Sequence, residues 1–543
     1  MKINEPISYE ECMKLDSDTR QGWKIAMDDE MNSLKKHNTW ELVPLPTGRK
    51  AITNKWVFKE KLNSDGERDK LKARLVVRGF TQQKDIDYDE TFAPVLHFNT
   101  FRTILSIATE KNLFMTQMDV STAFLNGELN EEIYMTQPEG YIDNTHPEYV
   151  CKLKKSLYGL KQAPRMWNKR INDFLLKCGF TRSVSDPCLY FKTKGNDIHL
   201  IGLFVDDLLQ ASNKKELLEE TRKLLESEFK MTYQGAPSQC LGIEIERDSE
   251  KGETKLLLSR YTKDLLTRFG MEKCNSAQTP QEINGKIIKA RKEDPVIDGE
   301  NYRQLVGSLI YLASRTRPDI SCAVRAVSEH LGHPTNASWL AAKRILRYLA
   351  GTVNYGLLYS RSADGTDIHG ISDADWGGCV NTRRSTTGNL VYMGKNLIMW
   401  KSTKQHTVAL SSTEAEYLGI TDTMKDLLWL KNLLVEIQYI TEDQSLRLLG
   451  DNAGSLDLAR NQVTLSRSKH IDIRHHFIRQ HVENGDVKIV HIPGKENIAD
   501  VLTKGLGKIA FNRCLASLGM ERFQSESGCE RVHVTGTAEC SSR

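Results

Sequence analysis

The sequence predicts a mixed α+β fold with two or three domains. At 543 residues the chain is long enough for that number of hydrophobic cores. Its first half carries short runs of strand formers bounded by turn residues, whereas residues 255–360 show helical periodicity. Beyond residue 365, apolar strands alternate with helical patterns, which is typical of an α/β domain.

The composition is that of an ordinary soluble protein, with 39% hydrophobic and 27% charged residues. No stretch approaches about eighteen consecutive apolar residues, and the N-terminus has no apolar segment, so we expect neither membrane spans nor secretion. The eleven cysteines are scattered and form no C-x-x-C pair, which indicates reduced thiols in an intracellular compartment.

Two basic segments contrast with the small net charge of +4. Residues 49–84 carry eleven Lys or Arg against four acids, and residues 152–170 carry seven and no acid. Aromatic residues, among them Trp56 and Trp167, are interleaved with these charges. Such segments suit phosphates and stacked bases, although a solvated surface is the simpler interpretation of either segment alone.

Asp119 follows an apolar run and precedes a turn of small residues, so we expect it at the end of a strand. A second pair of acids, Asp206 and Asp207, interrupts another apolar run. The surrounding strand formers predict a β-hairpin whose tight turn is Asp206-Asp207. A polar turn is the simpler alternative, because Asp is common in turns.

Like charges at a turn repel one another, and a divalent cation is the usual compensation. Mg²⁺ prefers such oxygen ligands. If the hairpin lies beside the strand of Asp119, then Asp119 and Asp206 can hold two metal ions as in enzymes of phosphoryl transfer. Asp207 is then expected to support the site rather than carry the main ligation.

The helical stretch predicts helices at residues 261–270, 302–314 and 336–350, with a polar linker at 275–300. Farther on, four acids follow in the order strand end, helix, strand end and helix start: Asp373, Glu414, Asp451 and Asp500. Strand ends and first helical turns favour carboxylates for stability, which explains each acid taken singly.

Several long motifs resemble the reverse transcriptase of copia-type LTR retrotransposons. They are the Asp119 block, the Asp206-Asp207 hairpin, residues 156–165 (SLYGLKQAPR) and residues 38–43 (NTWELV). The resemblance implies a right-hand polymerase with fingers, palm and thumb. Its palm aspartates, which bind metal, match Asp119, Asp206 and Asp207.

The resemblance also implies residues that bind the incoming nucleotide. Phe124 matches the aromatic residue under the sugar, which would clash with a 2′-hydroxyl and so disfavour ribonucleotides. Gln162 matches a glutamine that contacts the nucleotide. Lys72 or Arg74 is the expected triphosphate clamp, and residues 241–245 resemble the primer-grip hairpin.

The four downstream acids resemble those of the RNase H domain of the same retroelements, as does the run at residues 468–477. By this match Asp373, Glu414, Asp451 and Asp500 hold two Mg²⁺ ions, and water attacks the RNA strand of an RNA–DNA hybrid. The spacing favours Asp373 and Glu414 over the alternatives two residues away.

The alternative metal ligands, each two residues away, are Asp375 in place of Asp373 and Glu416 in place of Glu414. His491 is expected to be a surface histidine, with the orientation of a water or phosphate as the other interpretation. The pair His475-His476 has no metal-binding spacing and is read as structural or facing RNA.

The resemblance implies an α+β chain in which a right-hand polymerase precedes an α/β RNase H-like domain with a mixed sheet. The expected parts are a helical leader (1–36), fingers and palm (37–254), a mainly helical thumb and connection (255–364), the RNase H-like domain (365–512) and a disordered tail (513–543).

The implied activities are RNA-directed DNA polymerase and ribonuclease H, each with two Mg²⁺ ions for which Mn²⁺ can substitute. The implied partners are an RNA template, a DNA or tRNA-like primer, an RNA–DNA hybrid and deoxynucleoside triphosphates. The expected location is intracellular, in cytoplasmic virus-like particles or in the nucleus.

Two alternatives stay open: an inactive retroelement relic that only binds nucleic acid, and a nuclease whose polymerase part only binds the hybrid. No protease motif, integrase zinc site or nucleocapsid knuckle is present, so we expect the chain to correspond to the C-terminal part of a polyprotein.

Overall fold

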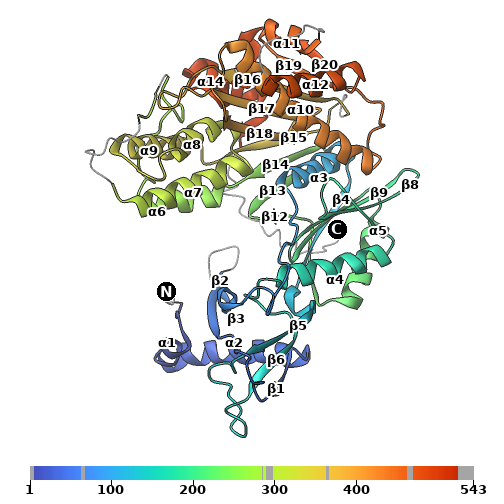
Figure 1. Cartoon of the computed structure of the whole chain (residues 1–543), viewed down its shortest axis with the longest axis vertical. Helices are drawn as coiled ribbons and strands as arrows, with labels where there is room; N and C mark the ends of the chain where they lie inside the picture. Colours follow the sequence, from blue (N-terminus) through green and yellow to red (C-terminus); the bar gives the residue numbers. More distant parts are fainter. Residues whose placement is uncertain are drawn as a thin grey trace, which may run out of the picture. The chain divides into compact units, whose positions relative to one another are not determined.

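The computed structural model describes residues 5–62, 68–283, 285–288, 297–362, 366–460 and 469–523. It is a mixed α+β structure, as predicted (Figure 1). The chain divides into two compact units, one of residues 1–241 and 432–441, and one of residues 242–431 and 442–543. Within the described ranges, no helix combines the length and the apolar character needed to cross a membrane.

The first unit begins with two helices that share a core with a hairpin. Asp16 caps the second helix by accepting the Thr19 N–H at 3.0 Å. Trp23 on that helix meets Phe58 edge-on, with ring centroids 5.2 Å apart. The predicted leader is therefore helical and packs into the first core. The elements are α1 (Tyr9–Met13), α2 (Ser17–Lys36), β2 (Asn54–Leu62) and β3 (Arg68–Val77).

Two further sheets complete the β structure of this unit. The small one has the order β1-β6-β5, with β1 (Trp40–Val43), β6 (Val150–Lys155) and β5 (Glu128–Met135). The larger has the order β11-β4-β10-β9-β8-β7. Its strands are β4 (Phe114–Val120), β7 (Thr181–Arg182), β8 (Leu189–Lys194), β9 (Asp197–Phe204), β10 (Asp207–Ser212) and β11 (Met231–Gly235).

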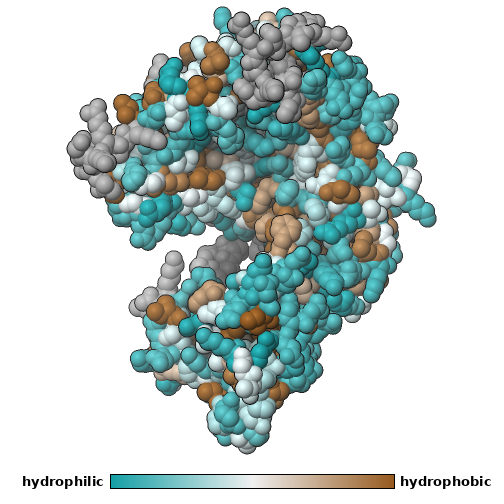
Figure 2. Space-filling model, in the orientation of Figure 1, coloured by the Kyte–Doolittle hydropathy of each residue, from teal (hydrophilic) through white to brown (hydrophobic). Residues whose placement is uncertain are grey.

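Three helices accompany the larger sheet: α3 (Phe98–Glu110), α4 (Ala163–Lys177) and α5 (Lys215–Glu228). Helices α4 and α5 each bury one apolar face, as their periodic spacing predicts, whereas α3 is buried on all sides over residues 100–109. On the face shown in Figure 2, hydrophilic residues predominate and apolar residues are scattered, because most large apolar side chains lie in the cores.

The second unit contains the helical stretch, and all three predicted helices are present. They are α6 (Ser259–Arg268), α7 (Gly299–Arg315) and α9 (Asn336–Gly351), and α8 (Ser321–Ser328) adds a fourth. Beside them, neighbouring antiparallel strands follow the order β13-β14-β15-β21. Their bounds are β13 (Ile243–Asp248), β14 (Glu253–Leu257), β15 (Tyr355–Ser360) and β21 (Met520–Arg522).

The prediction of a disordered tail from residue 513 is wrong as far as residue 523. Helix α14 (Lys508–Ser517) leads into β21, in which Met520 pairs with Leu357 of β15. Met520 and Phe523 are buried, so apolar packing with distant residues orders a segment that shows little periodicity of its own. Residues 524–543 lie outside the described residues, as do residue 284 and residues 289–296 of the predicted linker.

The C-terminal sheet has the order β18-β17-β16-β19-β20. Strands β16 to β18 are antiparallel, whereas β19 and β20 run parallel to β16, so the predicted mixed sheet is confirmed. Its strands are β16 (Ile368–Asp375), β17 (Thr386–Met393), β18 (Asn396–Lys404), β19 (Leu446–Gly450) and β20 (Val487–His491).

Helix α10 (Ser412–Glu436) is the helix on which Glu414 was expected. The other helices of this part are α11 (Ala453–Arg460), α12 (Lys469–Glu483) and α13 (Asp500–Thr503). The assignment to fingers, palm and thumb, and the domain boundaries, stay predictions.

Candidate active sites

The hairpin of the paired acids turns one residue earlier than predicted. Asp207 is the first residue of β10 and pairs with Phe204 of β9, so the two-residue turn is Val205-Asp206. Val205 has φ of +58°, a left-handed conformation that is unusual for a β-branched residue. The Trp167 Nε1–H donates to the Val205 carbonyl at 2.6 Å and holds the turn in place.

The strand of Asp119 lies beside this hairpin, as expected. Asp119 of β4 is opposite Asp207 of β10, and the Val120 N–H donates to the Asp206 carbonyl at 2.8 Å. The Asp207 carboxylate accepts a long hydrogen bond of 3.5 Å from Gln117 Nε2. Sheet pairing therefore brings the three predicted acids to one end of two neighbouring strands.

Tyr158, which the sequence analysis did not single out, is influenced by two of these acids. Burial raises its pKa to about 12, the charge of Arg74 opposes that shift, and the charges of Glu30, Asp206 and Asp119 add to it. The Arg74 guanidinium lies 4.7 Å from its ring centroid, and the Phe124 ring meets it edge-on at 5.0 Å. Two residues expected to bind nucleotide thus gather around one tyrosine near the acids. Its place in the SLYGLKQAPR run was the available signal.

Strand alternation explains how Arg74 reaches this position. Ala73 and Leu75 are buried, whereas Lys72 and Arg74 are only half-buried and occupy the other face of β3. Two cations two residues apart therefore share a face of β3.

Gln162 is placed differently from its prediction. It is fully buried, its Nε2 donates to the Asp87 carbonyl at 2.8 Å, and its Oε1 accepts from Gln82 Nε2 at 3.0 Å. Gln162 therefore holds the segment of Gln82 and Asp87, and its side chain has no exposed surface for the expected contact with a nucleotide.

A second group of acids converges in the C-terminal sheet. Asp373 on β16, Glu416 on α10 and Asp451 after β19 each offer an oxygen, and these atoms all lie within 4.8 Å of one another. Asp373 is 4% exposed and Glu416 is 8% exposed. The parallel pairing of β16 with β19 brings the two strand ends together. Within the described residues, no other group of three acids, histidines or cysteines meets this distance.

The structure corrects the predicted ligand on the helix from Glu414 to the alternative, Glu416. The Glu414 N–H donates to Ser411 Oγ at 3.1 Å, so Ser411 caps the helix, and the Glu414 carboxylate reaches back to accept the Leu410 N–H at 2.7 Å. Residues two apart on a helix point in nearly opposite directions, so Glu414 and Glu416 cannot both face the cluster. The Ser411-x-x-Glu414 spacing, a capping signature, was the signal in the sequence.

Burial and mutual repulsion perturb the acids of this cluster. Burial, with the charges of Asp373 and Asp451, raises the pKa of Glu416 to about 9. Burial and the neighbouring Asp500 raise the pKa of Asp373 to about 7. The nearby Lys504 lowers both pKa values but does not cancel these shifts, and a hard divalent cation with oxygen ligands would supply further positive charge, so the donor set fits Mg²⁺.

The remaining predicted residues lie around the cluster. Asp500 opens α13, forms an ion pair with Lys504 at 2.6 Å, and acts on the pKa of Asp373. Asp375 ends β16 outside the cluster and lines a cavity of about 140 Å³, so the structure favours Asp373 over Asp375. His491 contacts the Asp451 carbonyl at 3.2 Å, which satisfies this exposed histidine.

Only part of the predicted histidine motif lies in the described region. His476 is exposed on α12. Ser468 and the side chain of His475 fall outside the described residues, so the structure does not test them.

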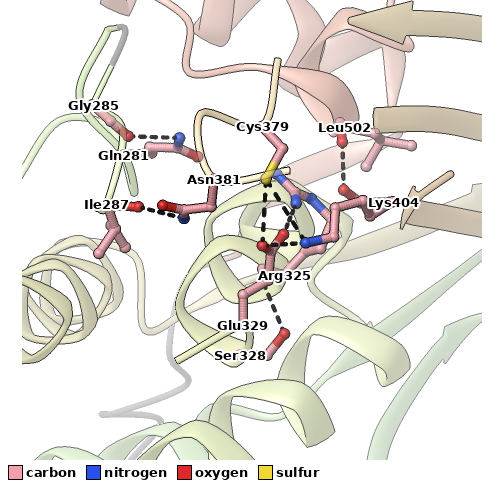
Figure 3. A network of polar contacts seen from close by, with 11 residues as sticks. Gln281, Gly285, Ile287, Arg325, Ser328, Glu329, Cys379, Asn381, Lys404 and Leu502 are labelled. Carbon is pink, nitrogen blue, oxygen red and sulfur yellow. Dashed lines mark hydrogen bonds and ion pairs between the residues drawn. The ribbon is translucent and has the colours of Figure 1, made fainter. Parts of the chain in front are cut away.

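A polar network holds the loop that follows Asp375 (Figure 3). Glu329 on α8 accepts from Arg325 at 2.6 Å and from Lys404 at 2.5 Å, and Lys404 also lies 3.8 Å from the Cys379 sulfur. Asn381 Nδ2 donates to the Ile287 carbonyl at 3.2 Å. The loop is therefore fixed to β18 and α8, next to the acidic cluster.

Comparisons with known proteins match most of the chain. The family model described as "Reverse transcriptase (RNA-dependent DNA polymerase)" matches residues 37–283. The chain is 38% identical over 536 residues to the "Retrovirus-related Pol polyprotein from transposon RE2" of Arabidopsis thaliana, which covers 97% of this chain and 36% of that protein. It therefore spans about a third of the length of that relative.

A yeast protein and a solved structure are also similar. The transposon Ty5-1 protein YCL074W of Saccharomyces cerevisiae is 33% identical over 311 residues, which cover 57% of this chain and 100% of that protein. The structure of the foamy viral protease-reverse transcriptase in complex with dsDNA has a TM-score of 0.46 and 13% identity, over 87% of this chain and 83% of that chain.

Proposed function

This chain belongs to the copia-type retrotransposon Pol polyprotein family with a reverse transcriptase domain, and we propose that it is an RNA-directed DNA polymerase with ribonuclease H activity. The observation that carries the proposal is the presence of two separate carboxylate sites in one chain. One lies at the β4 and β10 strands, and the other at β16, α10 and β19.

In the first site, Asp119 and Asp206 would hold Mg²⁺, with Asp207 in support. Bound there, Mg²⁺ would neutralise phosphate charge and make the attacking hydroxyl a better nucleophile. Lys72 or Arg74 attracts the triphosphate by charge. Phe124, fixed edge-on against Tyr158, excludes a 2′-hydroxyl by its bulk and so selects deoxynucleotides.

In the second site, Asp373, Glu416 and Asp451 would hold Mg²⁺, for which Mn²⁺ would substitute, and Asp500 lies beside them. The Lys504 ammonium, paired with Asp500, adds positive charge next to the acids. These residues suit hydrolysis of a phosphodiester, and the RNA strand of an RNA–DNA hybrid is the substrate that the polymerase would supply.

The same proposal includes the partners and the location. The partners would be an RNA template, a DNA or tRNA-like primer, the hybrid product and deoxynucleoside triphosphates. The location would be intracellular, in cytoplasmic virus-like particles or in the nucleus.

Two matched substitutions test the proposal. With Mg²⁺, an RNA template and a labelled primer, Asp206→Asn should abolish extension and leave cleavage of a preformed hybrid intact, whereas Asp451→Asn should do the reverse. Both changes keep the shape of the side chain and remove its charge. Wild-type protein without either activity would leave the alternative of an inactive relic that only binds nucleic acid.

A further inference from the structure

A cavity of about 280 Å³ in the first unit contains none of the catalytic acids. Phe92 and Pro94 line it from one segment of the chain, and Arg182 and Pro187 from another. The polar face of α4 forms the rest of the lining. Its size is close to the lower end of pockets that bind small molecules, about 300 Å³.

Helix α4 connects this cavity to the hairpin of the acids. Arg165 and Lys169, four residues apart, share one face of the helix and line the cavity. Trp167 and Ile171 on the other face are buried, and Trp167 holds the Val205 carbonyl. Two of the three cations that line the cavity, Arg165 and Lys169, belong to the basic segment of residues 152–170.

Buried hydrogen bonds connect the two chain segments that carry these lining residues. The fully buried Asp186, next to Pro187, accepts from the His97 N–H at 3.0 Å and from Thr100 Oγ1 at 2.5 Å. These bonds join the segment after Pro94 to the loop that carries Pro187. Arg182 Nε also donates to the Pro187 carbonyl at 2.8 Å. The cavity is thus built by tertiary contacts and does not depend on surface side chains alone.

The cavity is positively charged and has one exposed aromatic ring. Its lining includes the cations Arg165, Lys169 and Arg182 and no acid. Arg165 forms an ion pair with Glu90, whereas none of the described ion pairs involves the exposed Lys169. Phe92 is 76% exposed, so its ring is available for stacking.

We propose that this cavity binds one unpaired nucleotide of a single-stranded nucleic acid. Lys169 and Arg182 hold its phosphate, and Phe92 stacks on its base. Cations combined with an accessible aromatic ring are the usual means of binding single strands. An unpaired base is required because a paired and stacked base has no free face for the ring. The inference rests on the proposed function, for which the single strand would be the template that has not yet been copied.

The test measures the binding of a fluorescent single-stranded oligonucleotide of uridines to the full chain by anisotropy, in EDTA. Lys169→Glu should weaken binding about tenfold and lower the dependence of log K on log salt concentration by roughly one to two units. Phe92→Ala should weaken binding roughly fivefold or more, since stacking of one base contributes about 1–3 kcal/mol.

Lys177→Glu is the matched control. Lys177 is exposed on the same helix and does not line the cavity, so the same change of charge there should alter affinity less than about twofold. Equal weakening by both charge reversals would overturn the proposal, because binding would then depend on net charge alone. If the Phe92→Ala variant bound the oligonucleotide as tightly as wild type, the proposed stacking of the base on Phe92 would be refuted.

Two competitors identify the source of the nucleotide. An unlabelled single strand should displace the probe at nanomolar to micromolar concentrations, whereas a blunt duplex of the same length should compete poorly. Displacement by free uridine monophosphate at concentrations as low as those of the strand would overturn the assignment to a strand. The binding assay contains EDTA and does not depend on catalysis. A protein that fails to extend a primer can therefore still bind the oligonucleotide at this cavity, and the two outcomes can be told apart.

Discussion

Replacing Glu416 with Gln should stabilise the metal-free protein at neutral pH while it abolishes ribonuclease activity. Glu416 has its pKa raised from 4.5 to about 9 by burial and by the charges of Asp373 and Asp451. The folded state therefore keeps a proton that the unfolded state releases above pH 4.5. The contribution of this group to stability is complete below pH 4.5 and is lost progressively as the pH rises toward 9.

The magnitude follows from the size of the shift. One pKa unit corresponds to about 1.4 kcal/mol, so the loss between the unfolded pKa and pH 7 is about 3 kcal/mol. Gln carries no charge at any of these pH values, and Glu416→Gln removes the loss. In EDTA, the variant should be more stable than wild type by up to about 3 kcal/mol at pH 7, and the difference should shrink toward pH 5.

The assay is thermal unfolding in EDTA between pH 5 and pH 8.5, followed by the same scans with Mg²⁺. Added Mg²⁺ should raise the melting temperature of wild type more than that of the variant, because the variant has lost a ligand. Glu414→Gln is the matched control: Gln also serves in a capping box, so stability, its pH dependence and cleavage should stay close to wild type.

Two results would refute this reasoning. The first is a Glu416→Gln variant whose melting temperature falls with pH as steeply as that of wild type. The second is a Glu414→Gln variant that loses cleavage while Glu416→Gln retains it, which would return the metal ligand to the position first predicted from spacing.

Three further predictions concern other parts of the chain. Phe124→Ala should raise ribonucleotide incorporation relative to deoxynucleotide incorporation at least tenfold in primer extension with both substrates; an unchanged ratio would remove the steric role of Phe124. Trp167→Phe, which removes the donor to the Val205 carbonyl, should slow extension and cost about 1–3 kcal/mol, with hybrid cleavage unaffected as the internal control. Met520→Ala should lower stability by about 2–5 kcal/mol in denaturant unfolding, because this buried residue joins β21 to β15; a neutral effect would mean that the tail is not part of the fold.

Much of the fold could be predicted because its signals are local. Runs of strand formers predicted the hairpin at Asp206, and helical periodicity predicted the helices of the second unit within a few residues of their observed ends. The prediction of a disordered tail was wrong as far as residue 523 because Met520 and Phe523 are ordered by packing with residues far away in the chain. A local pattern contains no information about such a partner.

In the candidate sites, too, some features could be predicted from the sequence and others could not. The sequence predicted that Asp119 and Asp206 belong together, and the pairing of β4 with β10 confirms their proximity. It did not show that Gln162 is fully buried between Gln82 and Asp87, since burial depends on how separate segments meet. The position of Tyr158 beside Arg74 and Phe124 was not predicted either, because it also depends on how separate segments of the chain meet.

The sequence by itself determined which residue types occur in which order: acids at strand ends, an acidic helix start and basic segments with aromatic residues. These features depend on neighbours within a few positions along the chain, so they can be read without the fold. Only the tertiary structure decided that Glu416 and not Glu414 faces Asp373 and Asp451. Glu414 lies in the first turn of α10 and Glu416 follows two residues later, and the direction in which that helix packs on the sheet selects the one that joins the site.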